Sequence, residues 1–301
     1  MMFVWLVVAA GLFSAGALPV YRELKRQPKP KATPMAQLSQ GATRYRWYGD
    51  PGAPVAVCVH GLSTPSVVFD ELAQELVLMG YRVLTYDLYG RGSSSTPKAR
   101  QTPDFFAKQF NELMANQDIA NDITLIGYSM GGVIATHLAA QNPHRFREVI
   151  LLAPAGMTSV ADRPTRWAMA TPLLGDWAFH LIYPRHMSDS LKRDAESGTK
   201  AVSILDEQLA ELGTRGFVGS VLSSLRGTLR HKQEATHRKL AQTNVPVTAI
   251  WGREDTVIPL RALGTLTQWN RNARQVVIDG AGHGLPHTHA VEIADALADG
   301  Y

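Results

Sequence analysis

Ser129 lies in the pentapeptide GYSMG, between a β-like apolar run and a helix-like segment. ITLI precedes this pentapeptide, and VIATHLAA follows shortly after it. In a tight turn from strand to helix, glycines two positions before and after a serine avoid clashes that a Cβ would cause, and the serine is held in a strained, exposed conformation. A serine hydroxyl is a weak nucleophile that needs a base and a group to stabilise an oxyanion. The N–H of Met130, at the start of the expected helix, would point at that developing negative charge.

A base and an acid for this serine are expected in the loops that follow two later apolar runs. WGRED ends in Glu254 and Asp255, and GAGH ends in His283. A histidine can take the proton of a serine and return it to a leaving group, while a carboxylate holds the imidazole tautomer and stabilises its charged form. Either acid could be a solvated loop residue. The glycine-flanked loop after the last apolar run distinguishes His283 from the other histidines.

Short β-branched runs recur along the chain and predict the strands that would position these loops. They cover residues 55–59, 82–86, 123–126, 148–152, 247–251 and 275–278. Several are almost entirely apolar, which is typical of strands covered on both faces in a parallel sheet. Helix-like segments lie between them, at residues 69–79, 105–116, 133–141 and 262–269. This alternation predicts an α/β fold with a mostly parallel, doubly wound sheet.

The alternation breaks once, in the segment between residues 152 and 247. Residues 156–238 are too many for a crossover and too rich in helix formers for a loop, so they predict a helical lid. The core would then comprise residues 41–155 and 239–301. Large apolar side chains of the expected lid are Trp167, Met169, Trp177, Phe179, Tyr183, Met187 and Phe217. Any one of them could simply pack the lid onto the core, but as a group they predict a water-poor cavity above the sheet.

These motifs together resemble the α/β-hydrolase superfamily, from about Arg44 to the C-terminus apart from the lid. Beside GYSMG, the matching elements are VHGL at residues 59–62, DLYGRGS at 87–93, WGRED at 251–255 and GAGH at 280–283. The chain order of serine, acid and histidine is the order expected of that fold. The pattern looks like capped serine esterases and lipases, including monoacylglycerol lipases. It departs from the family habit of an acidic residue shortly after the histidine.

The resemblance implies a catalytic set and an oxyanion hole. The catalytic set is Ser129, Asp255 and His283, and the oxyanion hole is formed by the N–H groups of Leu62 and Met130. Asp255 is therefore favoured over Glu254 as the acid. His60 is interpreted as a structural hydrogen-bonding residue beside the oxyanion turn. The DLYGRG loop is interpreted as a structural turn, because its spacing matches neither a P-loop nor a dinucleotide fingerprint.

A serine at this tight turn from strand to helix disfavours dehalogenase and epoxide hydrolase chemistry, because similar families carry out those reactions with an aspartate at this position. Acyl transfer to water remains, and the apolar lid favours an apolar acyl group. The predicted substrates are small-molecule or lipid carboxylic esters that resemble monoacylglycerols or lysophospholipids, although thioesters and amides share the tetrahedral intermediate. One alternative is hydrolysis of a carbon–carbon bond in a vinylogous diketone by the same triad. Another is a ligand-binding protein without catalysis.

The formal net charge of +4 is concentrated in one segment. RELKRQPKPK, residues 22–31, carries five bases and one acid, so the rest of the chain is neutral overall. No nucleic-acid partner is therefore predicted. No cofactor or metal is predicted either. His283, His287 and His289 lie close in sequence, but Pro286 indicates the start of a helix that would disperse their side chains.

The N-terminal residues 1–21 carry no charged side chain and have about the length of a membrane-spanning helix. A basic, proline-containing linker over residues 22–40 follows them. The flanking positive charges predict a single-pass membrane anchor with the catalytic domain in the cytoplasm. The alternative is a cleaved signal peptide and a secreted or periplasmic protein, since Ala15-Gly16-Ala17 offers a cleavage pattern.

Overall fold

The computed structural model describes residues 5, 16–30, 32–159, 161–196 and 204–299. Within these residues, an eight-stranded sheet has the strand order β1-β2-β4-β3-β5-β6-β7-β8. The strands are β1 (Met35–Leu38), β2 (Gly41–Tyr48), β3 (Val55–Val59), β4 (Arg82–Tyr86), β5 (Ile123–Tyr128), β6 (Phe146–Leu152), β7 (Val247–Gly252) and β8 (Arg274–Ile278). β1 and β2 pair antiparallel with each other, and β2 pairs antiparallel with β4. The remaining six strands, in the sheet order β4-β3-β5-β6-β7-β8, are parallel.

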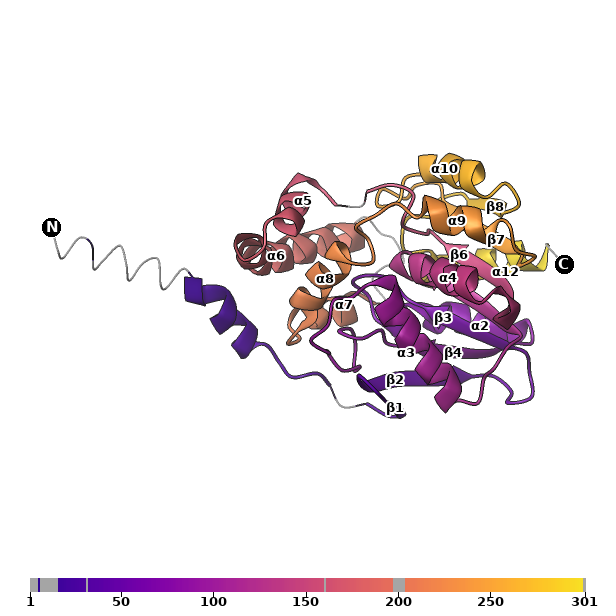
Figure 1. Cartoon of the computed structure of the whole chain (residues 1–301), viewed down its shortest axis with the longest axis horizontal. Coiled ribbons are helices and arrows are strands. Elements are labelled where there is room, and N and C mark those ends of the chain that lie inside the picture. The colour runs from indigo at the N-terminus through magenta and orange to yellow at the C-terminus, as the bar shows by residue number, and fades with distance from the viewer. Residues whose placement is uncertain (1–4, 6–15, 31, 160, 197–203, 300–301) are drawn as a thin grey trace.

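Helices cover both faces of the sheet (Figure 1). One face is covered by α3 (Pro103–Asn116), α4 (Met130–Gln141), α9 (Glu234–Leu240) and α10 (Arg261–Trp269). The other face is covered by α2 (Asp70–Leu78), α11 (Leu285–Thr288) and α12 (Ala290–Ala298). Short 3-10 helices, η1 (Ser66–Phe69) and η2 (Pro143–Arg145), precede α2 and β6. The predicted α/β fold with a mostly parallel sheet is confirmed.

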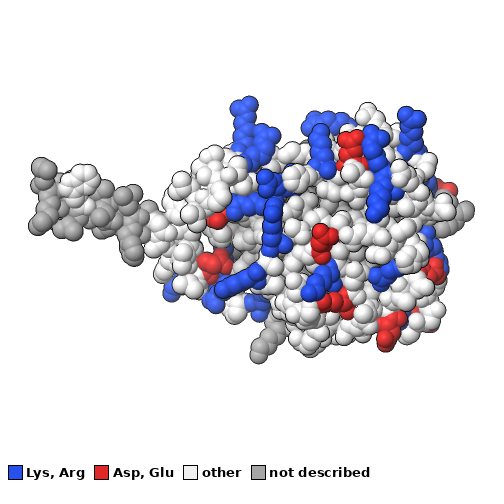
Figure 2. Space-filling view, viewed as in Figure 1, with Lys and Arg blue, Asp and Glu red and all other residues white. Residues whose placement is uncertain are grey.

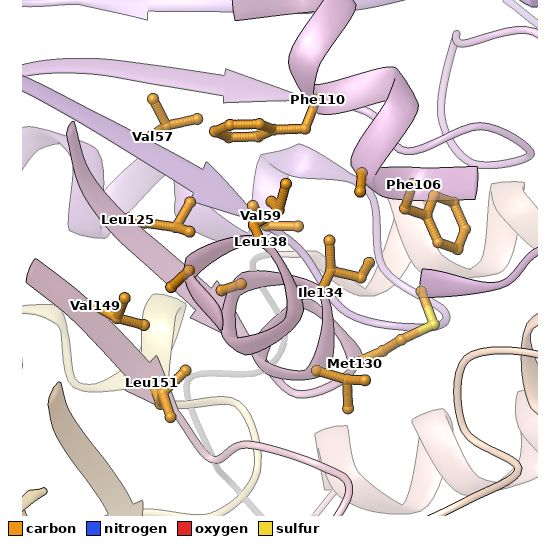
Figure 3. Close-up of a cluster of buried hydrophobic side chains, with 14 of the residues drawn as sticks. Val57, Val59, Phe106, Phe110, Leu125, Met130, Ile134, Leu138, Val149 and Leu151 are labelled. Atoms are coloured by element: carbon orange, nitrogen blue, oxygen red, sulfur yellow. The ribbon is translucent and has the colours of Figure 1, made fainter. Parts of the chain in front are cut away.

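The main core lies between the central strands and the helices α3 and α4. Alternate residues of β3, β5 and β6 point toward these helices, as the labelled side chains Val57, Leu125 and Val149 show (Figure 3). All three are fully buried, as is Ile134 of α4. Because both faces of these strands are covered, their sequences are almost uninterrupted apolar runs. β1 and β2 were not among the predicted strands, since polar residues alternate along GATRYRWY.

Four helices between β6 and α9 form a separate layer, which we call the lid. They are α5 (Arg163–Ala170), α6 (Leu174–Glu196), α7 (Leu205–Leu212) and α8 (Phe217–Arg226). These helices share a small apolar core of their own, which includes Phe179, Phe217 and Val221. The predicted lid boundary at residue 238 falls inside α9, whose Leu240 packs with α4 in the main core.

The prediction of a membrane-spanning N-terminus was wrong, and with it the predicted location of the protein. None of the helices formed by the described residues is both long and apolar enough to cross a bilayer. The described N-terminal helix covers residues 16–25 and continues through the charged residues Arg22, Glu23 and Lys25. The expectation had counted only the uncharged run before Arg22. Most of that run, residues 1–4 and 6–15, lies outside the described residues.

The N-terminal segment is attached to the lid and the core by several hydrogen bonds. The N–H of Gln27 donates to the carbonyl of Gly213 at 2.9 Å, and the N–H of Arg215 donates back to Gln27 at 2.8 Å. The Lys29 ammonium donates to the carbonyl of Gly92 at 2.9 Å. On the face shown in Figure 2, basic and acidic side chains are interspersed, with basic ones in the majority.

Candidate active site

Ser129 occupies the sharp turn between β5 and α4. Its backbone has φ 52° and ψ −114°, a strained conformation for a residue with a side chain. The turn is held because the N–H of Ser129 donates to Leu152 and its carbonyl accepts from the N–H of Ala155, at 2.9 and 3.0 Å. A Cβ at Gly131 would lie 1.9 Å from the carbonyl oxygen of Val59, so only glycine fits there. The strain at Ser129 is therefore imposed by its surroundings.

The structure brings Ser129, Asp255 and His283 together from three loops. The Nε2 atom of His283 lies 3.1 Å from the Ser129 hydroxyl oxygen. Its Nδ1 atom lies 2.8 Å from Oδ2 of Asp255. A carboxylate accepts hydrogen bonds, so this contact fixes the proton on Nδ1 and leaves Nε2 free to accept one from Ser129.

Asp255 is buried and held by its own loop. Its Oδ1 atom accepts the N–H groups of Val257 and Ile258 at 2.8 and 2.7 Å, which leaves Oδ2 directed at His283. Glu254, the other candidate acid, is exposed. The two adjacent carboxylates thus have different environments, and Asp255 is the one that contacts the imidazole.

Leu62 and Met130 flank the serine from two sides. Met130 is the first residue of α4, and Leu62 lies in the turn after β3. That turn approaches the serine closely, because a Cβ at Gly61 would lie 3.3 Å from the Ser129 Cβ. Among the described residues, the Leu62 N–H has no protein acceptor. Met130 thus adjoins Ser129 in the chain, and Leu62 follows the glycine that approaches it. The assignment of their N–H groups to an oxyanion hole stays a prediction.

His60 connects this turn to the end of β4. Its Nε2 accepts the N–H of Leu88 at 2.8 Å, so the ring proton is on Nδ1, which lies 2.9 Å from the carbonyl of Gly61. Burial lowers the pKa of His60 to about 4 and keeps the ring neutral. The Gly61 carbonyl belongs to the same peptide unit as the Leu62 N–H. His60 thus fixes the orientation of that N–H.

A cavity of about 850 Å³ lies above Ser129 and His283. The lid contributes the apolar residues Tyr183, Met187, Leu191 and Leu225 and the polar residues Thr165, His186, Ser190 and Gln208, and Leu229 after α8 also lines the cavity. Of the seven apolar lid residues considered in the sequence, only Tyr183 and Met187 line this cavity. Phe179 and Phe217 pack inside the lid, and the Trp167 side chain is half exposed. A larger groove of about 1290 Å³ on the other side of α8 includes none of the three residues brought together here.

In the part of the chain that the structure describes, no group of three or more His, Cys, Asp or Glu side chains is placed to hold a metal ion. His287 and His289 are close to His283 in sequence, but only His283 contacts Asp255. His287 is buried, and this burial lowers its pKa to about 4.

The chain belongs to the alpha/beta hydrolase fold family, whose model matches residues 54–290. It is 28% identical over 248 residues to a pimeloyl-[acyl-carrier protein] methyl ester esterase of Neisseria meningitidis, a match that covers 80% of this chain and 91% of the relative. It is 25% identical over 259 residues to an uncharacterised hydrolase of Bacillus subtilis, a match that covers 85% of this chain and 92% of the relative. The protein is thus a relative of esterases and other hydrolases.

Solved structures share the fold. A thermophilic esterase from Thermogutta terrifontis superposes with a TM-score of 0.72 at 18% identity, over 89% of this chain and 97% of its own. A structure described as a membrane phospholipase A, a bacterial virulence factor, superposes with a TM-score of 0.70 at 20% identity, over 99% of this chain and 96% of its own. At these identities the likeness concerns the fold alone.

Proposed function

We propose that this protein is a serine hydrolase that cleaves carboxylic esters through an acyl-enzyme, with Ser129 as nucleophile, His283 as base and Asp255 as the acid that orients it. The observation that carries the proposal is the continuous hydrogen-bonded path from Asp255 through His283 to Ser129, at 2.8 and 3.1 Å. Donor–acceptor contacts of this length are what proton transfer from a serine requires.

The reaction follows from this geometry. His283 takes the hydroxyl proton through Nε2 as Ser129 Oγ bonds to the ester carbonyl carbon, and the carbonyl oxygen becomes an oxyanion. The N–H groups of Leu62 and Met130 stabilise this charge. When the tetrahedral intermediate collapses, the leaving alkoxide takes the proton from His283 and departs as an alcohol. Water then attacks the acyl-enzyme by the same route, and the acid and free Ser129 are released.

An apolar acyl chain is the substrate feature that the cavity favours. Its lid side combines Tyr183, Met187 and three leucines, which can pack against an apolar acyl chain, with the polar residues Asp162, Thr165, His186, Ser190 and Gln208. Each buried CH₂ contributes about 0.8 kcal/mol, or roughly a fourfold gain in kcat/KM when it is bound in the transition state. Esters of monoacylglycerol or lysophospholipid type fit this lining. The esterase named among the relatives supports ester cleavage more generally.

A substrate panel tests the proposal. It comprises p-nitrophenyl esters from acetyl to decanoyl, a monoacylglycerol, a lysophospholipid and a vinylogous diketone. We expect kcat/KM to rise at least tenfold from acetyl to octanoyl ester. We expect Ser129→Ala to reduce kcat by about 10⁴-fold or more. Preferential cleavage of the diketone would favour carbon–carbon hydrolysis. Substrate binding without turnover by the folded wild type would favour a binding protein.

A further inference from the structure

Arg91 is a fully buried cation in the loop after β4 that makes no ion pair among the described residues. Its side chain is 0% exposed, yet each acceptor in contact with it is an uncharged oxygen. A buried guanidinium is costly unless its N–H groups are satisfied. Burial lowers its pKa to about 10, so the side chain remains charged near neutral pH. Such a residue points to a specific structural task.

The guanidinium joins three segments of the chain. Nε donates to the carbonyl of Leu62 at 3.0 Å. One terminal nitrogen donates to Tyr89 at 3.1 Å and also to the Gln101 side chain. The other donates to the Ser224 hydroxyl of α8 at 2.9 Å. The planar fork of arginine can make these contacts at once, whereas an ammonium cannot.

Close approach to the lid depends on the glycine before Arg91. Gly90 has φ +85°, and a Cβ there would lie 2.3 Å from the Ser220 hydroxyl of α8. The loop can therefore press against α8 only with glycine at this position. Arg91 then reaches the lid on one side and the turn after β3 on the other.

Both peptide units that flank the Leu62 α-carbon are held by named side chains. His60 holds the carbonyl of Gly61, and Arg91 holds the carbonyl of Leu62. Together the two contacts restrict the backbone dihedrals of Leu62, whose N–H is the donor that the proposed function assigns to the oxyanion hole. A change in either contact would redirect this donor.

We infer that Arg91 is a positioning residue for ester hydrolysis, which holds Leu62 in the oxyanion-binding conformation and fastens the lid helix α8 to it. This inference rests on the proposed function, because it needs an oxyanion at Ser129. Arg91 touches no reacting atom and acts only through Leu62. Its removal should therefore weaken transition-state binding more than substrate binding.

The first test compares Arg91→Lys with Arg147→Lys, an exposed arginine that pairs with Asp122 away from the site. We expect Arg91→Lys to lower kcat by about 10- to 100-fold, an effect no larger than the removal of one oxyanion donor. Its KM should stay within about threefold of the wild-type value. The affinity of an alkyl trifluoromethyl ketone should fall by a similar factor, because its adduct with Ser129 carries an oxyanion. Arg147→Lys should leave all three values unchanged. Retention of wild-type kcat by Arg91→Lys would overturn the inference.

Two further measurements separate positioning from general loosening. In Arg91→Lys, amide hydrogen exchange should accelerate in residues 60–64 and stay unchanged in β3; equal acceleration in both would contradict a local role. Ser224→Ala removes the hydrogen bonds of this hydroxyl to Arg91 and Gln101 but keeps the contact between Arg91 and Leu62, so its kcat should stay within about threefold of wild type. A loss as large as that of Arg91→Lys would assign the effect to the lid instead.

Failure of the inference and failure of the proposed function give different results. If the wild type hydrolyses esters and binds the ketone while Arg91→Lys does so equally well, only the role of Arg91 is lost. If the folded wild type shows no ester hydrolysis and no ketone adduct, the proposed function itself is wrong.

Discussion

Among the residues of the site, Asp255 illustrates how one carboxylate is separated from its neighbour. Two backbone N–H groups hold Oδ1, and this leaves Oδ2 facing the His283 ring. Glu254 is one residue away in sequence but is exposed, at the edge of the same cavity. The geometry thus gives the two acids different expected effects on catalysis, although their chemistry is the same.

Substitution of these acids should separate their roles. We expect Asp255→Asn to lower kcat by roughly 10³- to 10⁴-fold, because an amide no longer selects the imidazole tautomer that accepts the serine proton. Glu254→Gln should change kcat by less than about threefold. Steady-state ester hydrolysis by the two folded variants measures this. Equal losses in both would contradict the assignment of Asp255.

At the scale of elements, the site depends on how closely α4 approaches β3. Gly131 in the first turn of α4 lies against the carbonyl of Val59, and this contact sets the position of the Ser129 turn. Gly264 in α10 offers a contrast, because a Cβ there would meet nothing within 4 Å. One helical glycine is therefore required by packing and the other is not.

The two glycines predict opposite effects of alanine. Gly131→Ala should lower the free energy of unfolding by about 3 kcal/mol or more, because the added methyl forces α4 away from β3. Gly264→Ala should raise it by about 0.5 to 1 kcal/mol, the gain usual for glycine to alanine in a helix. Urea unfolding followed by circular dichroism measures both. An unchanged free energy of unfolding in Gly131→Ala would show that the turn at Ser129 is not closely packed.

At the scale of the whole molecule, three buried histidines couple stability to pH. His60 lies beside the oxyanion turn, His237 in α9 and His287 in α11, and burial lowers the pKa of each from 6.5 to about 4. Between pH 4 and 6.5 the unfolded chain therefore binds more protons than the folded one. Stability from these groups is fully present above pH 6.5 and is lost as the pH falls toward 4.

His237→Phe tests this linkage away from the site, since the ring packs 6.0 Å from Trp269. We expect the wild-type free energy of unfolding to fall as the pH is lowered from 7 to 5. The fall in the free energy of unfolding should be smaller in the variant, because it lacks one titrating imidazole. The difference between the two proteins should be up to about 1.4 kcal/mol per pH unit. Denaturant unfolding at the two pH values gives the comparison. Identical losses in both proteins would show that His237 does not contribute.

The sequence predicted the fold and the candidate triad because their signals are local. Each of Ser129, Asp255 and His283 follows an apolar strand in a short motif. The sequence failed where a role depends on distant segments. Arg91 contacts Leu62 and Ser224, 29 and 133 residues away, and no local pattern in GRG indicates this. A large cation between two glycines was the available signal.

The strands β1 and β2 were missed and the N-terminal segment was wrongly predicted, for different reasons. β2 alternates polar and apolar residues, as a strand near the sheet edge can, so a search for apolar runs passed over it. The helix over residues 16–25 continues into the charged segment, where Gln27 and Lys29 contact the lid and the loop after β4. Hydrophobic length alone did not predict these polar contacts.

The most direct test of the central claim is covalent labelling of the full chain with an alkyl fluorophosphonate, followed by intact mass spectrometry. The account predicts one adduct on the wild type and none on Ser129→Ala, because only a serine paired with a base and an oxyanion hole attacks the phosphorus rapidly. An adduct retained by Ser129→Ala, or no adduct on the folded wild type, would contradict the assignment of Ser129 as the nucleophile.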